Sequence, residues 1–187
     1  GSGNTGTIKN FTITNGTGTQ HPINQMDYYG GGIYCENGGL IKLENLLIHN
    51  NSAIQNGAGI WLQSYHTIIK NVEVYDNISN EGTEAQGGVT LQGGTGYLQN
   101  CIIRDNIGSG FYITNGDSVV INKSSIYNNS DYGARVYASD LTIVNSIVKG
   151  NSGTSNGHSD STQIWGSGST QLKINYSLIQ NGENMVA

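Results

Sequence analysis

Apolar and polar residues alternate along short stretches of this chain, as in GIYCE at 32–36 and VEVYD at 72–76. Each stretch extends over about four to six residues, and alternation with a period of two is the pattern of a β-strand with one buried face. No stretch places its apolar residues with the 3.6-residue period of an amphipathic helix. The pattern therefore predicts an all-β fold.

The strand-like stretches recur in a fixed order, which is typical of a repeat protein. One kind of segment occurs as GGIYCE at 31–36 and AGIWLQ at 58–63, and a second kind follows as LENLLIHNN at 43–51 and IKNVEVYDN at 69–77. The shortest unit has about 22 residues, too few to bury its own apolar side, whereas stacked units bury it against one another. Three strands per unit predict a right-handed, single-stranded parallel β-helix of about seven coils. We expect it to form one domain over residues 1–187.

We name the strands of a coil PB1, PB2 and PB3 in chain order, and the turns that follow them T1, T2 and T3. The residues predicted to face the core are nearly all apolar. In PB1 they are Ile33, Cys35, Ile60, Leu62, Val89, Leu91, Phe111, Ile113, Ala134 and Val136. In PB3 they are Phe11, Ile13, Leu46, Ile48, Val72, Val74, Cys101, Ile103, Ile126, Val148 and Leu178. In the last coil Leu172 and Ile174 lie one residue out of phase, which predicts a bulge.

Two columns of asparagine run through the repeats. The first, at the T2 turn, consists of Asn10, Asn45, Asn71, Asn100, Lys123, Asn145 and Asn175. The second, at the start of T3, consists of Asn51, Asn77, Asn106, Asn129, Asn151 and Asn181. Stacked side-chain amides can bond one another and the turn backbone, so we interpret both columns as scaffold, with Lys123 as a break in the first.

Composition excludes several classes of protein. The net charge of -5 and the pI near 5.2 argue against a nucleic-acid partner, which would require a basic face. No run of 18 apolar residues is present to insert into a membrane. Two cysteines cannot form a disulfide framework, and the four histidines are too dispersed to predict a metal site.

The pattern GG-I-Y, followed by L-x-N-x-x-I-x-N-N-S, resembles the bacterial pectate-lyase-like superfamily of right-handed parallel β-helices. More narrowly, the chain is similar to the secreted and cell-surface branch with polymorphic outer-membrane-protein-type repeats. The resemblance implies a ligand along PB1, between the T1 and T3 loops, and an extracellular or bacterial cell-surface location. Because the fold hosts lyases, hydrolases, epimerases and adhesins, it does not fix an activity. Neither end shows a capping element, so we expect flanking domains of a larger protein.

The outward residues of PB1 form the candidate ligand site. The first outward row is Tyr34, Trp61, Thr90, Tyr112, Arg135 and Trp165, and the second is Glu36, Gln63, Gln92, Thr114, Tyr137 and Ser167. Aromatic faces stack on sugar rings while carboxamides and hydroxyls bond their hydroxyl groups. The predicted ligand-binding residues are Tyr34, Trp61, Gln63, Gln92, Tyr112, Arg135, Tyr137 and Trp165. Long T3 insertions at 15–30, 78–86 and 152–161 would wall a groove, or would instead lie over the aromatic row.

An enzyme is the alternative interpretation. Arg135 is the one strong base on PB1 and Glu36 its one carboxylate, with Asp131 close by in the sequence. A lyase or hydrolase would use Arg135 as base or substrate clamp, assisted by Glu36 or Asp131. No aspartate cluster with calcium-ligand spacing is present, so no cofactor is predicted, although Ca²⁺ would suit a lyase.

The sequence therefore favours a non-catalytic module that binds a polysaccharide or surface glycan along PB1, or that forms the shaft of an adhesin. A polysaccharide lyase or glycoside hydrolase and a spacer without any ligand remain the alternatives. The outer row of PB3 is His49, Tyr75, Arg104, Tyr127 and Lys149. Because Asp76 and Asp105 lie beside it, we interpret this row as a solvated face.

Overall fold

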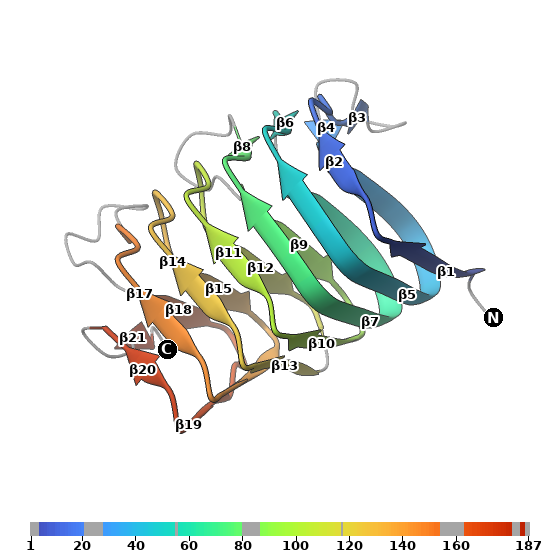
Figure 1. Ribbon diagram of the computed structural model, residues 1–187. Coiled ribbons are helices and arrows are strands. Elements are labelled where there is room, and N and C mark those ends of the chain that lie inside the picture. The colour runs from blue at the N-terminus through green and yellow to red at the C-terminus, as the bar shows by residue number, and fades with distance from the viewer. Residues whose placement is uncertain are drawn as a thin grey trace.

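The computed structural model describes residues 4–20, 28–54, 56–79, 87–116, 118–153, 163–180 and 184–185. Within these ranges the chain forms β-strands and turns and no helix, so no helix there could cross a bilayer. The strands pair in parallel in three stacks, one for each side of the coil, and Figure 1 shows them side by side from the N-terminal to the C-terminal end. The predicted all-β parallel solenoid is confirmed.

Two long strands pass through all three sides of the solenoid without a break. These are β5 (Ile33–His49) and β7 (Ile60–Tyr75), which pair along most of their length. PB1 consists of 33–36 in β5, 60–63 in β7, β9 (Val89–Gln92), β12 (Phe111–Thr114), β15 (Ala134–Tyr137), β18 (Ile164–Ser167) and β21 (Asn184–Met185). PB2 consists of β1 (Asn4–Lys9), 38–44 in β5, 64–70 in β7, β10 (Thr95–Gln99), β13 (Ser118–Asn122), β16 (Asp140–Val144) and β19 (Leu172–Asn175).

The third stack lies at the front of Figure 1. PB3 consists of β2 (Thr12–Thr14), 46–49 in β5, 72–75 in β7, β11 (Ile102–Arg104), β14 (Ser125–Tyr127), β17 (Ile147–Lys149) and β20 (Leu178–Ile179). Two short pairs lie outside the stacks: β3 (Thr19–Gln20) with β4 (Tyr28–Tyr29), antiparallel, and β6 (Ser52–Ala53) with β8 (Ile78–Ser79), parallel.

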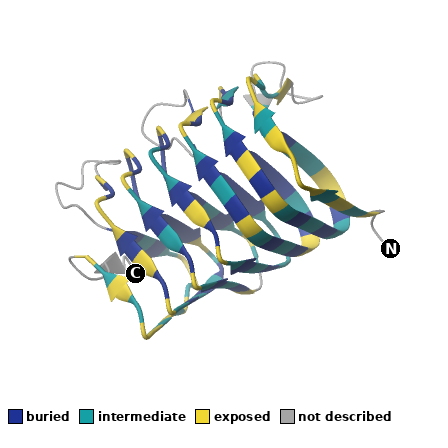
Figure 2. Cartoon of the chain, in the orientation of Figure 1, coloured by how far each residue is buried: buried dark blue, intermediate teal, exposed yellow. Residues whose placement is uncertain are grey.

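The core is a narrow channel filled by the inward residues of all three stacks. Buried and exposed residues alternate along the strands in Figure 2, as a period of two requires. The predicted inward columns are confirmed at most positions, and PB2 adds Leu43, Ile69, Leu98, Ile121 and Ile143, each at most 1% exposed. Because paired strands lie about 4.8 Å apart, like side chains stack directly on one another.

Three core predictions were wrong, and two share one cause. Leu178 is 58% exposed, because Ile179 rather than Leu178 pairs with buried Val148. Leu172 and Ile174 pair in phase with β16, without the predicted bulge. In both cases the anchor of the last coil is Tyr176 and not Asn175, so the predicted alignment was displaced by one residue.

Phe11 is the third error. Its carbonyl accepts a hydrogen bond from the backbone N–H of Leu47, which aligns Phe11 with Leu46. Leu46 is 1% exposed, whereas Phe11 is 63% exposed. The coil of β1 and β2 pairs with β5 alone, so its inward positions have a neighbouring coil on one side only.

The T2 turns require left-handed backbone, and the first asparagine column supplies it. The φ angle is positive at each anchor: Asn10, Asn45, Asn71, Asn100, Lys123, Asn145 and Tyr176. Asparagine tolerates this conformation better than other residues with a side chain. The amides of Asn45, Asn71 and Asn100 each donate to the preceding asparagine over 2.8–3.0 Å. Lys123 ends this exposed ladder, as predicted.

The second column is a buried ladder. Asn51, Asn77, Asn106, Asn129 and Asn151 are at most 2% exposed, and each of the first four donates from Nδ2 to the Oδ1 of the next over 2.9–3.0 Å. Each Oδ1 from Asn77 onward also accepts the backbone N–H of the preceding asparagine. The amide of Asn151 donates to Oε1 of Gln163 over 2.7 Å, and this glutamine was not predicted as a rung. Asn181 lies outside the described residues.

The buried ladder explains the glycines directly before β12 and β15, which are Gly110 and Gly133. A Cβ on Gly110 would lie 2.6 Å from Nδ2 of Asn129, and one on Gly133 would lie 2.6 Å from Nδ2 of Asn151. Real Cβ atoms do not approach a neighbour this closely. Glycine directly before these PB1 strands is therefore a packing requirement of the ladder.

We expect Asn106→Ala to lower the free energy of unfolding by about 2–4 kcal/mol. The variant removes the hydrogen-bond partner of the buried backbone N–H of Asn77 and of the carbonyl of Val74. Asn100→Ala, in the exposed ladder, is the matched control and should cost less than about 1 kcal/mol. Urea unfolding followed by circular dichroism measures both. Equal losses would show that burial of the ladder contributes nothing.

We expect Lys123→Asn to raise the free energy of unfolding by about 0.5–1.5 kcal/mol, because asparagine suits φ of 49° and can bond Asn100. Lys173→Asn, in a strand of the same face, provides the control. A thermal midpoint for Lys123→Asn no higher than that of the parent chain would contradict the ladder interpretation.

Candidate functional site

The structure brings the predicted PB1 residues together in two parallel rows. In the first row Tyr34 pairs with Trp61, and Tyr112, Arg135 and Trp165 follow in register on β12, β15 and β18. In the second row the paired residues are Gln63, Gln92, Thr114, Tyr137 and Ser167. Neighbours in each row lie about 4.8 Å apart. Three residues of the first row, Trp61, Thr90 and Arg135, are buried, whereas no residue of the second row is.

Trp61, in the first row, is closed off by other aromatic rings. It is 5% exposed, and its ring stacks on that of Tyr34 with centroids 4.9 Å apart. The ring of Tyr29, from β4, lies 5.5 Å away. Burial raises the pKa of the Tyr34 hydroxyl above its ordinary value, and the nearby Glu36 carboxylate adds to the shift. The Trp61 ring therefore packs within the protein and offers no open face to a ligand.

Arg135 is similarly enclosed further along the same row. It is 6% exposed, and its guanidinium carbon lies 5.1 Å from the centroid of the Trp165 ring and 5.4 Å from that of Tyr112. Tyr132, which is completely buried, lies 6.0 Å from the Trp165 ring. Aromatic faces attract a guanidinium most strongly when both are desolvated. The geometry therefore favours a packing role for this cluster.

Asp131 belongs to the scaffold beside this cluster. It is 3% exposed, and its Oδ2 accepts a hydrogen bond of 2.7 Å from the Ser109 hydroxyl. Its carbonyl oxygen accepts the backbone N–H of Gly153. Burial raises the pKa of the adjacent Tyr132, the Asp131 charge raises it further, and Arg135 acts in the opposite direction.

The three candidate catalytic residues do not form one constellation. Glu36 lies in β5 and Arg135 in β15, separated by the pairings β5–β7–β9–β12–β15. These four steps of about 4.8 Å place the two residues roughly 19 Å apart. Paired carboxylates in glycosidases lie within about 10 Å of each other, and a base and its partner must meet at one sugar. Glu36 therefore cannot act together with Arg135 and Asp131.

Five side chains of the second row reach solvent and keep their hydrogen-bonding groups available. Gln63, Gln92, Thr114 and Ser167 are half-buried, and Tyr137 is 46% exposed. Within the described residues none of these five side chains takes part in a hydrogen bond. The row therefore presents amide and hydroxyl groups at a regular spacing toward solvent.

Tyr65 was missed by the sequence analysis. It is 63% exposed and lies two residues beyond Gln63, where β7 continues into PB2 without a break. Ser64 between them faces inward and bonds the Thr67 hydroxyl over 2.6 Å. The unbroken alternation from Trp61 through Gln63 to Tyr65 is the sequence signal for this residue, whereas the predicted PB1 segment ends at Gln63.

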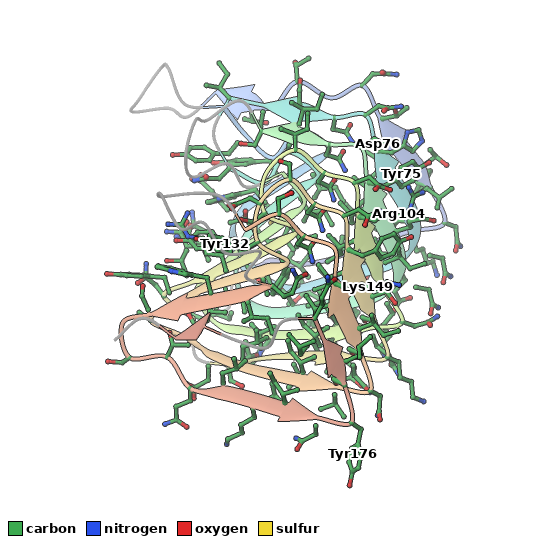
Figure 3. The ribbon with its side chains drawn as sticks, turned by 90° about the vertical axis from the view of Figure 1, so that its left-hand side faces the viewer. Tyr75, Asp76, Arg104, Tyr132, Lys149 and Tyr176 are labelled. Atoms are coloured by element: carbon green, nitrogen blue, oxygen red, sulfur yellow. The ribbon has the colours of Figure 1, made fainter. Side chains whose placement is uncertain are left out.

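The outer row of PB3 is internally paired. The His49 and Tyr75 rings stack with centroids 4.8 Å apart, and the guanidinium carbon of Arg104 lies 4.2 Å from the Tyr75 centroid. Arg104 also forms ion pairs of 2.7 Å with Glu73 and Asp105, which raise its pKa. Figure 3 shows Tyr75, Arg104 and Lys149 along one side of the molecule, away from Tyr132.

No group of three or more His, Cys, Asp or Glu within the described ranges could hold a metal ion. The segments 21–27, 80–86 and 154–162, in the insertions expected to wall a groove, lie outside those ranges. Cys35 and Cys101 are free thiols, and burial raises the pKa of Cys101 to about 11. That pKa keeps the Cys101 thiol protonated and unreactive near neutral pH.

The difference in burial between Trp61 and Tyr65 predicts losses of stability of very different size. We expect Trp61→Ala to lower the free energy of unfolding by about 3–5 kcal/mol, because it empties a buried site. Tyr65→Ala should change it by less than about 1 kcal/mol, because that ring is mostly in water. Guanidinium unfolding monitored by circular dichroism distinguishes them. A near-neutral Trp61→Ala would place that ring on the surface.

The chain matches the family model described as "Right handed beta helix region" over residues 1–184. No curated protein and no solved structure matches it. The match covers almost the whole chain and agrees with the three parallel stacks and with the turn ladders. The chain belongs to the right-handed β-helix family.

Proposed function

We propose that this chain is a non-catalytic carbohydrate-binding module whose site is the open PB1 row. The site comprises Gln63, Gln92, Thr114, Tyr137 and Ser167, with Tyr65 at its edge. It keeps the PB1 location of the predicted site and moves the contacts from the first outward row to the second. The ligand is a polysaccharide or surface glycan, and the module acts outside the cell, on a bacterial surface.

The observation that carries this proposal is the contrast between the polar rows of the molecule. The side chains of the buried asparagine column form hydrogen bonds inside the protein, with amides and backbone groups of adjacent coils. Gln63, Gln92 and Thr114 form no such bonds within the described residues, although they stand in the same strict register. A row of hydrogen-bond donors and acceptors without partners among the described residues suits a linear ligand with regularly spaced hydroxyl groups.

Two tyrosines supply apolar surface beside the polar row. Tyr137 lies within the row and Tyr65 at the T1 edge, and they are 46% and 63% exposed. Tyrosine combines a flat ring that packs on the apolar face of a sugar with a hydroxyl group that remains hydrated. We therefore assign the stacking role, predicted for Trp61 and Trp165, to Tyr65 and Tyr137.

The arrangement favours binding over catalysis. Arg135 and Asp131 are buried and in contact with other residues, and Glu36 lies roughly 19 Å from Arg135. A binding module needs only the regular surface that the open row provides. The same surface would serve the shaft of an adhesin, which also displays a repeated face to a glycan.

The double variant Gln63→Ala/Gln92→Ala should weaken polysaccharide binding about tenfold or more, since it removes two sets of hydrogen bonds worth about 0.5–1.5 kcal/mol each. Tyr137→Ala should weaken it comparably. Gln99→Ala, which removes the same side chain from the outer side of PB2, is the matched control and should bind like the parent chain. A glycan array followed by affinity gel electrophoresis provides the measurement.

The same polysaccharides are incubated with the chain and assayed for new reducing or unsaturated ends. Binding that depends on Gln63 and Gln92, without new ends, supports the proposal. New ends would identify an enzyme and make Arg135 the first residue to test. No binding to any polysaccharide would reject the module and favour a spacer.

A further inference from the structure

The positions of all the strong cations in this chain are known. The eight lysines and arginines are Lys9, Lys42, Lys70, Arg104, Lys123, Arg135, Lys149 and Lys173, and every one lies within the described ranges. The remaining segments contain no lysine or arginine in their sequence, so they bring no such charge to any surface. The distribution of fixed positive charge can therefore be assigned completely.

Seven of these eight side chains lie outside the PB1 face. Lys9, Lys42, Lys70 and Lys173 lie on PB2, Lys123 at T2, and Arg104 and Lys149 on PB3. Arg135 alone belongs to PB1, where it is 6% exposed and enclosed by the Tyr112 and Trp165 rings. No lysine or arginine is thus presented to solvent on PB1.

The exposed chemistry of PB1 is neutral or acidic. The open row consists of two carboxamides, two aliphatic hydroxyl groups and a phenol, and none of these carries a charge near neutral pH. Glu36 is exposed near the beginning of the row, on β5. A carboxylate at this position repels an anion that lies along the strands.

We infer that the carbohydrate bound by this row is a neutral polysaccharide, without uronate, sulfate or phosphate groups. The inference rests on the proposed function and names its ligand class. Proteins recognise carboxylate and sulfate groups with arginine or lysine, whose charge and fork geometry compensate for the desolvation of the anion. The PB1 row lacks that compensation, whereas its amides and hydroxyls can both donate to and accept from sugar hydroxyls.

The overall field acts in the same direction. The chain carries a net charge of -5, and its solvent-exposed lysines and arginines lie on PB2, on PB3 and at the T2 turn. A negative electrostatic potential lowers the local concentration of anionic ligands and slows their association. A polyanion that approaches PB1 is therefore disfavoured both at long range and on contact.

The test is affinity gel electrophoresis of the purified chain through gels that contain one polysaccharide each. The neutral set is a mixed-linkage glucan, a mannan and a galactan, and the acidic set is polygalacturonate, alginate and chondroitin sulfate. We expect at least one neutral polymer to retard the chain, with at least tenfold weaker retardation by every acidic polymer. Binding to the neutral polymer should be unchanged between 0.05 and about 0.5 M salt, since no ion pair is formed.

A charge variant sharpens the test. Glu36→Lys should give measurable, salt-sensitive retardation by polygalacturonate, which the parent chain should not show. Glu44→Lys, which makes the same charge change on PB2, is the matched control and should leave polygalacturonate binding unchanged.

The outcomes separate the two proposals. Retardation by an acidic polymer alone, lost in Gln63→Ala/Gln92→Ala, overturns the neutral-ligand inference and leaves the binding module standing. Retardation by no polymer overturns both. Neutral retardation that depends on Gln63 and Gln92, together with the Glu36→Lys result, supports both.

Discussion

The buried asparagine ladder is the interaction on which the rest of this structure depends. A parallel solenoid must turn its chain sharply at T3 and still satisfy the backbone groups that it buries there. Each ladder asparagine donates to the next amide and to backbone carbonyls, as Asn77 does toward Asn106 and Ile48. An unsatisfied buried polar group would cost about 1–3 kcal/mol at each coil. The ladder also forces glycine before PB1, because Gly110 and Gly133 lie against its amides.

The ladder fixes the register of the outer surface as well. When every coil turns at the same rung, outward residues at equivalent positions stand in straight rows regardless of the loop between them. Gln163 occupies the rung after Asn151 although it lies only 12 residues further along the chain, whereas successive asparagine rungs lie 22–29 residues apart. One consequence is that a row can be filled by packed aromatics, as with Trp61, while its neighbour remains open, as with Gln63.

The open PB1 row therefore combines a regular scaffold with amide and hydroxyl groups that face solvent. A ligand that binds it would meet groups already held in position, so little conformational entropy is lost on binding. The lysines and Arg104 lie on PB2, on PB3 and at the T2 turn, and Arg135 is buried beneath the PB1 surface. This division of charge leaves the PB1 surface without a solvent-exposed lysine or arginine.

The sequence alone determined the fold, because a period of two and a repeated asparagine are local signals that each coil carries in full. It also determined which residues share a row, as Gln63 and Gln92 do, because register follows from the turn positions. It misaligned the last coil, where Tyr176 holds the anchor position that asparagine marks elsewhere. Only the tertiary structure decided which outward residues meet solvent, because the burial of Trp61 and Arg135 depends on rings from other coils and from β4 that no local pattern encodes.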